Sequence, residues 1–271
     1  MLINVKGQSI YAYTGGKKFE ASKPTMIFIH GVLNDHSVWI LQSRFFANHG
    51  WNVLAIDLPG YCKSSGTTPR SVEAAAKFIE DFMDAADLKT ACLVGHSWGS
   101  LIALEAAAIL QERICQLVLI GIAFPMRVSK NLLETSSSDP MKAWKMVNIF
   151  SRSTLAPPPS SLGPGTWVYG SSMALGKRVL LSNTSVNLFH TGFLACDQYA
   201  GGEEAIAKVK CPVLFALGES DQMTPPKGAK ALINACPQSQ VIYLPGGHNQ
   251  MTETPEELLQ AMNDFLKPTS I

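Results

Sequence analysis

Short apolar runs recur along the chain, and each one stops at a glycine, a proline or a polar residue. Within a run, apolar residues follow one another instead of alternating with polar ones, which is typical of strands buried on both faces. The six runs are Thr25 to Gly31, Asn52 to Gly60, Thr90 to Ser97, Gln116 to Ala123, Pro212 to Asp221 and Gln240 to His248. Residues 3–14 alternate around a central glycine instead, which predicts an N-terminal hairpin.

Helical patterns separate most of these runs. They cover Ser71 to Ala86, Ser100 to Leu110, Pro226 to Cys236 and Pro255 to Leu266. Ser71 is a residue of the type that caps a helix N-terminus. Because strands and helices alternate, the pattern predicts an α/β fold, with a mostly parallel twisted sheet flanked by helices on both faces.

The alternation breaks between Phe124 and Glu204, where no clear strand-like run occurs and Ser151 to Gly165 has the composition of a loop. We interpret residues 124–204 as a helical cap inserted into a core formed by residues 1–123 and 205–271. The alternative is an unrelated second domain, but the segment has few charges and would expose much apolar surface on its own. A cap of this kind is expected to set specificity, and substitutions at Trp144 or Trp167 are expected to change the ranking of substrates.

Composition narrows the choice of partners. Charged residues make up 16% of the 271 positions, against an average of about 25%, and apolar residues make up 46%. The 22 basic and 21 acidic residues give a formal net charge of +1. This balance indicates neither a nucleic-acid partner nor an anionic membrane surface. The expected partner is a small molecule, and no feature of the sequence predicts the oligomeric state.

The cysteines indicate a reducing compartment and no metal. None of the six forms a C-x-x-C pair or a metal-ligand spacing with a histidine, so reduced thiols in a cytoplasmic protein are expected. They are Cys62, Cys92, Cys115, Cys196, Cys211 and Cys236. The first 18 residues lack the apolar region of a signal peptide, and the longest membrane-segment candidate, Leu117 to Met126, is too short to span.

One serine stands between two glycines, two residues from each, where a predicted strand turns into a predicted helix. The stretch is Gly95-His96-Ser97-Trp98-Gly99. Such a turn holds the serine in a strained conformation, and glycines remove the Cβ atoms that would clash with strand and helix. The serine oxygen then projects at the carboxyl edge of the sheet, where open parallel sheets bind ligands. Ser97 is therefore a candidate nucleophile.

A serine hydroxyl needs a base, and the base needs an orienting acid. His248 follows the last apolar run and precedes the C-terminal helical pattern, and Asp221 follows the run before it. Both lie at strand ends, so we expect them at the same edge of the sheet as Ser97. Glu219 is an alternative acid that lies nearer the end of its strand.

Attack of a serine on a carbonyl produces a tetrahedral oxyanion, and backbone N–H groups are needed to stabilise its charge. A His-Gly pair after the first long run lets the chain turn so that the next amide, Val32, faces the serine. The amide of Trp98, directly after the nucleophile, is the second predicted donor. His36 and Met251 lie close to these motifs and are candidates for substrate contact.

These motifs make the chain similar to the α/β-hydrolase fold superfamily, in particular its capped serine esterases and haloperoxidase-like proteins. The resemblance extends over essentially the whole chain and is carried by HGVLNDHSVW, DLPGYCKS, GHSWGS, GESDQMTPP and GGHNQMTETPEELLQAMNDFL. It implies hydrolysis of an ester, amide, lactone or carbon-carbon bond without metal or cofactor, with Asp221 as the acid. One departure is Cys62, where glycine is more usual. Asp57 in the same stretch is then a structural carboxylate.

The resemblance also limits the reaction. Dehalogenases and epoxide hydrolases of this fold carry an aspartate at the nucleophile position, which Ser97 excludes. The expected function is cleavage of a carboxylic ester on a small apolar or aromatic substrate through an acyl-enzyme intermediate. A carbon-carbon bond hydrolase of a ring-cleavage product on the same triad stays open. So does an alternative of another class, a non-enzymatic ligand-binding protein on this scaffold.

Overall fold

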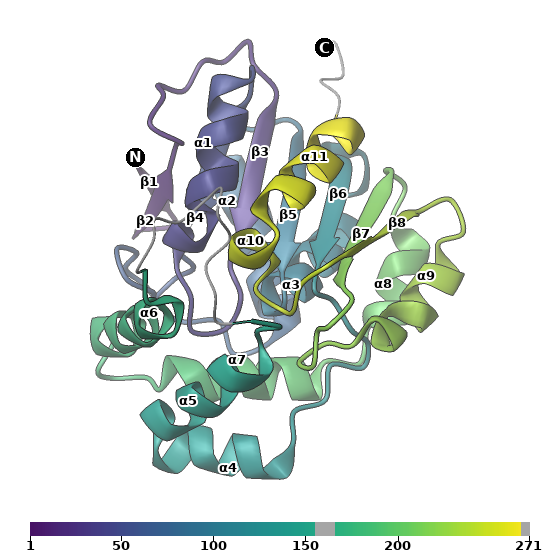
Figure 1. Ribbon diagram of the computed structural model, residues 1–271. Coiled ribbons are helices and arrows are strands. Elements are labelled where there is room, and N and C mark those ends of the chain that lie inside the picture. The colour runs from purple at the N-terminus through teal and green to yellow at the C-terminus, as the bar shows by residue number, and fades with distance from the viewer. Residues whose placement is uncertain (155–165, 267–271) are drawn as a thin grey trace.

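The computed structural model describes residues 1–154 and 166–266. Eight strands in this part of the chain form one sheet with the order β1-β2-β4-β3-β5-β6-β7-β8 (Figure 1). The strands are β1 (Leu2–Val5), β2 (Gln8–Tyr13), β3 (Thr25–Ile29), β4 (Asn52–Ile56), β5 (Ala91–His96), β6 (Ile114–Ile120), β7 (Val213–Gly218) and β8 (Gln240–Leu244). Five of the six predicted runs contain one of these strands, and the sixth, Gln116 to Ala123, overlaps β6, which begins at Ile114.

The pairing explains why the runs are continuously apolar. Strands β3 to β8 pair in parallel, and β3, β4, β5 and β7 are buried at every position. In β3, Ile27 and Ile29 pack into the core on one face of the sheet, and Met26 and Phe28 pack into the core on the other. The predicted hairpin is β1 with β2, joined by a turn in which Lys6 and Gly7 have positive φ angles.

Helices cover both faces of this sheet, as predicted. On one face lie α2 (Val72–Ala85), α3 (Trp98–Leu110), α8 (Gly202–Lys208) and α9 (Lys230–Ala235), and on the other lie α1 (Ile40–Asn48), α10 (Gln250–Glu253) and α11 (Pro255–Phe265). Ser71 caps α2, because its side chain accepts a hydrogen bond from the Ala74 amide. No helix among the described residues is long and apolar enough to cross a membrane.

Four more helices gather at one end of the sheet (Figure 1). They are α4 (Lys130–Ser138), α5 (Pro140–Phe150), α6 (Val168–Ser182) and α7 (Leu188–Gln198). They lie within the segment that we interpret as a cap, although α8 begins inside that segment and packs against α3. Residues 155–165, most of the proline-rich loop, lie outside the described residues.

The two tryptophans of this segment have different surroundings. Trp144 is buried, and its indole Nε1 donates to the Ser172 carbonyl at 2.9 Å. Its ring lies so close to Gly176 that a Cβ there would overlap it. Trp167, in contrast, is 72% exposed. Trp144 therefore holds α5 to α6, whereas Trp167 lies on the surface.

Candidate active site

Ser97 joins β5 to α3 with φ 56° and ψ −121°, a conformation that side-chain-bearing residues rarely adopt. A Cβ on Gly95 would lie 2.7 Å from the Ser100 Cα, and a Cβ on Gly99 would lie 2.7 Å from the His30 carbonyl oxygen. Both contacts are too short for real Cβ atoms. The two glycines are therefore required by the close approach of strand and helix at this turn.

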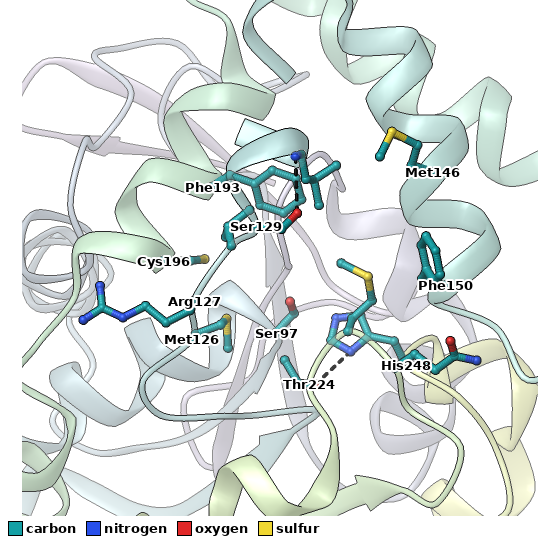
Figure 2. A pocket seen from close by; sticks show the side chains of 14 residues that line it. Ser97, Met126, Arg127, Ser129, Met146, Phe150, Phe193, Cys196, Thr224 and His248 are labelled. Carbon is teal, nitrogen blue, oxygen red and sulfur yellow. Dashed lines mark hydrogen bonds between the residues drawn. The ribbon is translucent and has the colours of Figure 1, made fainter. Parts of the chain in front are cut away.

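His248 and Asp221 form a buried pair beside this serine. The two atoms in contact are His248 Nδ1 and Asp221 Oδ2, at 2.8 Å. His248 is 6% exposed and Asp221 is 4% exposed. His248 lines the same cavity as Ser97 (Figure 2). Among the described residues no hydrogen bond joins Ser97 Oγ to His248, as is common before a substrate tightens such contacts.

Asp221 is held by more than the histidine. Its Oδ1 accepts hydrogen bonds from the backbone amides of Met223 and Thr224, at 2.9 and 2.8 Å. Burial by itself raises the pKa of Asp221, but the charge and hydrogen bond of His248 and the hydrogen bonds from Thr224 outweigh it. The pKa therefore lies below its ordinary value, and the group is a carboxylate at neutral pH. Glu219 is exposed and shares none of these contacts.

Thr224 belongs to the site, and the sequence analysis did not identify it. Its buried hydroxyl lies 2.8 Å from Asp221 Oδ2, 2.9 Å from the Gly121 carbonyl oxygen and 3.0 Å from His248 Nδ1 (Figure 2). Asp221 does favour a turn in which its side chain accepts a nearby backbone amide, as it does from Met223, but that local signal says nothing about the Thr224 hydroxyl. The Thr224 hydroxyl and the Asp221 carboxylate therefore both place an oxygen beside His248 Nδ1.

His96 holds the backbone of His248. Its Nε2 lies 2.8 Å from the His248 carbonyl oxygen, and their ring centroids are 4.6 Å apart. Burial, and next the charge of His248, lower the pKa of His96 to about 3, so the ring is neutral at pH 7. Because a carbonyl only accepts, the proton of this neutral ring lies on Nε2.

The two predicted oxyanion donors are the backbone amide of Trp98, directly after Ser97, and that of Val32, in the loop after β3. In the described part of the chain, neither the Val32 nor the Trp98 amide donates a hydrogen bond. Trp98 begins α3, where the partial positive charge of the helix N-terminus lies. Val32 lines a small cavity together with Ser97 and His248. Both amides therefore stay predicted oxyanion donors.

A larger cavity of about 250 Å³ opens in front of Ser97 and His248 (Figure 2). Its wall is mostly apolar. The apolar side chains that line it include Met126, Leu132, Met146, Phe150, Phe193 and Met223. The side chain of Arg127 also belongs to the lining of this cavity. Its guanidinium points away from Ser97 and donates to the Asp197 carbonyl at 2.7 Å (Figure 2). The space in front of the serine therefore suits a neutral, apolar group.

Residues 24–166, more than half of the chain, match the model of the alpha/beta hydrolase fold family. The chain belongs to this family. A putative esterase/lipase 2 of Mycoplasma pneumoniae is 31% identical over 116 residues, which is 42% of each chain, so the match spans less than half of that relative. The 2-hydroxy-6-oxononadienedioate/2-hydroxy-6-oxononatrienedioate hydrolase of Paraburkholderia phymatum is 26% identical over 91% of this chain and 88% of its own.

Solved structures agree with the family at the level of the fold. An esterase from Exiguobacterium antarcticum superposes with a TM-score of 0.80 and 18% identity. The superposition covers 97% of this chain and 98% of that one. The α/β-hydrolase fold predicted from the motifs is therefore confirmed.

The structure places the two candidate contact residues of this α/β-hydrolase-fold chain away from the cavity of Ser97. His36 donates its backbone amide to Asp57 Oδ1 and holds its Nδ1 2.8 Å from the same oxygen. It lines a separate groove beside α6. Met251 is buried in the core between the sheet and α11, where its carbonyl accepts a hydrogen bond from Gln42. Neither residue lines the cavity in front of Ser97.

The loop that departs from the family pattern has a physical explanation. Cys62 has a φ angle of 42°, a region that favours glycine. Its thiol donates to Asp35 Oδ2 at 3.3 Å. Asp57 is fully buried and also accepts the backbone amide of Lys63, as a structural carboxylate does.

Asp35, His36 and Asp57 also form a group of potential metal ligands, whose ligand atoms lie within 4.8 Å of one another. Asp35 already pairs with Arg178 of α6 at 2.6 Å, and Asp57 Oδ1 already binds His36. Burial would raise the pKa of Asp35, but hydrogen bonds from Ser37 and Arg178 lower it to about 2. The chemistry of this group is that of an ion pair between the core and α6.

Proposed function

We propose that this protein is a serine hydrolase that cleaves a carboxylic ester or related acyl bond through Ser97, His248 and Asp221. The observation that carries the proposal is the buried His248–Asp221 pair, 2.8 Å apart, whose histidine lines one cavity with a serine at a strained strand-to-helix turn. Nucleophile, base and orienting acid are the three parts that acyl transfer needs. The membership of the chain in the hydrolase-fold family supports the same reaction.

The reaction has two steps. Ser97 Oγ attacks the carbonyl carbon while His248 Nε2 accepts its proton, and the same proton then passes to the leaving alcohol. Water attacks the acyl-enzyme with His248 again as base, which releases the acid and restores Ser97. Asp221, kept as a carboxylate, holds the proton on His248 Nδ1 and stabilises the imidazolium that forms in each step.

The negative charge that develops on the carbonyl oxygen needs fixed donors. Within the described residues the amides of Val32 and Trp98 donate no hydrogen bond; Trp98 directly follows Ser97, and Val32 lines a small cavity with it. Each donor of this kind stabilises the transition state by about 3 kcal/mol. Because both donors are backbone groups, the side chains of Val32 and Trp98 remain available for packing.

The substrate in this proposal is small and neutral, with an apolar acyl or alcohol group. The cavity of about 250 Å³ is below the range of roughly 300 to 1,000 Å³ that is typical of drug-sized ligands. Residues 124–204 act as the cap, since α4, α5 and α7 supply most of the apolar wall.

A carbon-carbon bond hydrolase on the same triad is the second candidate. The relative that supports it is the Paraburkholderia phymatum hydrolase, because that match extends over nearly the full length of both chains. The apolar cavity, with Arg127 turned away from Ser97, favours a neutral ester instead.

Turnover of a p-nitrophenyl ester beside a vinylogous diketone separates the two candidates. We expect the ester to be hydrolysed and the diketone to be left intact. Turnover of the diketone alone would establish the second candidate. A protein that binds ligands without catalysis would turn over neither compound and would not react with a fluorophosphonate.

Phe150 is expected to limit substrate length. It lies at the end of α5, lines the cavity and is 48% exposed, so its ring closes the outer wall. Phe150→Ala removes that wall, and we expect kcat/KM for an octanoyl relative to an acetyl ester to rise about tenfold, since burying two further methylenes contributes about 1.6 kcal/mol. A p-nitrophenyl ester series measures the ratio.

The sequence alone suggested that Trp167 changes the ranking of substrates, but Trp167 is exposed and does not line the cavity, so Trp167→Ala is the control for this prediction. It should leave the ratio unchanged. An unchanged ratio in Phe150→Ala as well would mean that Phe150 does not bound the acyl site.

A further inference from the structure

The end of α5 is tied to the loop that carries His248. The Ser151 carbonyl accepts hydrogen bonds from the backbone amides of His248 and Asn249, at 2.8 and 3.2 Å. The Asn249 side chain also donates to Ser151 Oγ at 2.9 Å. One residue of the cap therefore binds the backbone of the proposed base directly.

Glu253 adds a bridge between the same two segments. Its Oε1 accepts the Ser153 amide at 2.7 Å, the Ser153 hydroxyl at 2.8 Å and the Thr154 amide at 3.4 Å. Its Oε2 accepts the amide of Gly247, the residue before His248, at 3.2 Å. The carboxylate thus holds cap backbone with one oxygen and the histidine loop with the other.

The contact leaves no room for a side chain on the loop. A Cβ on Gly247 would lie 2.7 Å from the Ser153 amide nitrogen and 2.9 Å from the Ser151 carbonyl oxygen. The second glycine of the GGH stretch is therefore required by the close approach of residues 151–153, independently of the hydrogen bonds to Glu253.

The backbone of His248 is consequently held from two sides. Its amide donates to Ser151 of the cap, and its carbonyl accepts from His96, the residue before the proposed nucleophile. His96 fixes the histidine relative to the elbow, and the cap fixes it from the other side. A shift of the end of α5 must move the imidazole relative to Ser97.

We infer that Glu253 is a positioning residue for His248, which it holds in register with Ser97 by clamping the Gly247 amide to residues 153–154 of the cap. This inference rests on the proposed function. It adds that the cap, besides bounding the substrate cavity, is a support of the catalytic base.

The test uses Glu253→Gln and Gly247→Ala, with Glu257→Gln as the matched control. The glutamine has one acceptor oxygen in place of two, so its amide NH₂ faces either the Gly247 amide or the Ser153 and Thr154 donors. The new methyl group in Gly247→Ala displaces the cap segment while Glu253 stays intact. Glu257 is exposed in the first turn of α11.

The readouts are kcat and KM on p-nitrophenyl acetate, the rate at which a small fluorophosphonate labels Ser97, and the melting temperature. We expect both test variants to lose about 10- to 100-fold in kcat and in labelling rate, the effect of misplacing a catalytic group by about 1 Å. The KM for p-nitrophenyl acetate should change less than about threefold, since so small an acyl group does not need the full cavity. Glu257→Gln should behave as the unsubstituted protein.

Two results would overturn the inference. If the test variants keep normal kcat and labelling on acetate and differ only in melting temperature or in KM for long esters, Glu253 only holds the cap. If only one of the two variants loses activity, the clamp is not the shared cause. A failure of the proposed function is a different result, because Ser97→Ala would then keep its activity and labelling whatever Glu253 does.

Discussion

Ser97→Ala is expected to abolish ester hydrolysis and covalent labelling by a fluorophosphonate. The substitution removes only the hydroxyl. Alanine keeps the Cβ, so the backbone strain at φ 56° is the same as with serine and the fold should be retained. In a serine protease, loss of the nucleophile lowers kcat by about 10⁶-fold. We expect a loss of the same order here, measured on a p-nitrophenyl ester.

Ser137→Ala serves as the control, because Ser137 is exposed on α4. It should retain full labelling and turnover. Labelling that survives in Ser97→Ala at the unsubstituted rate would place the nucleophile elsewhere and remove the basis of the proposed function.

Asp221→Asn is expected to lower kcat by about ten-thousandfold with little change in KM, as in other Ser-His-Asp sites. The hydrogen bonds determine how the asparagine sits. Because the amides of Met223 and Thr224 donate to Oδ1, the amide oxygen takes that position and the NH₂ group faces His248 Nδ1. The histidine then accepts there, carries its proton on Nε2, and cannot take the proton of Ser97.

Glu219→Gln is the comparison, since Glu219 is exposed and is the other carboxylate in this loop. Its kcat should stay within about twofold. A crippled Glu219→Gln beside a near-normal Asp221→Asn would make Glu219 the acid. The kinetics are measured by steady-state turnover of one ester for both variants.

The strands were predictable because β3, β4, β5 and β7 are buried on both faces, and continuous apolar runs mark such strands directly. Helix α1 was not predicted. Its buried residues include Gln42 and Ser43, and Gln42 donates to the Met251 carbonyl, so no apolar stripe marks the helix. Burial of polar side chains depends on tertiary partners that local sequence does not show.

The same reasoning applies to the candidate site. Ser97, Asp221 and His248 follow strand ends, and parallel topology brings strand ends together. His36 was a candidate for substrate contact because it is near Val32 in sequence, yet its ring turns toward Asp57. Glu253 gave no signal at all, because its partner Ser153 lies in the segment after α5, 100 residues away in sequence, and only the folded chain brings that segment to the loop of Gly247.

The insertion between β6 and β7 has a consequence for the order in which the molecule folds. Leu117 of β6 pairs with Val213 of β7, so this central ladder joins two strands separated by the whole proposed cap. Closing so long a loop costs more entropy than closing the short connections among β3, β4 and β5, and non-local pairing slows folding. Until β7 arrives, β6 presents an apolar edge with unpaired backbone groups, the kind of edge that recruits other chains. During synthesis, this edge is therefore the region of the nascent chain most in need of protection from aggregation.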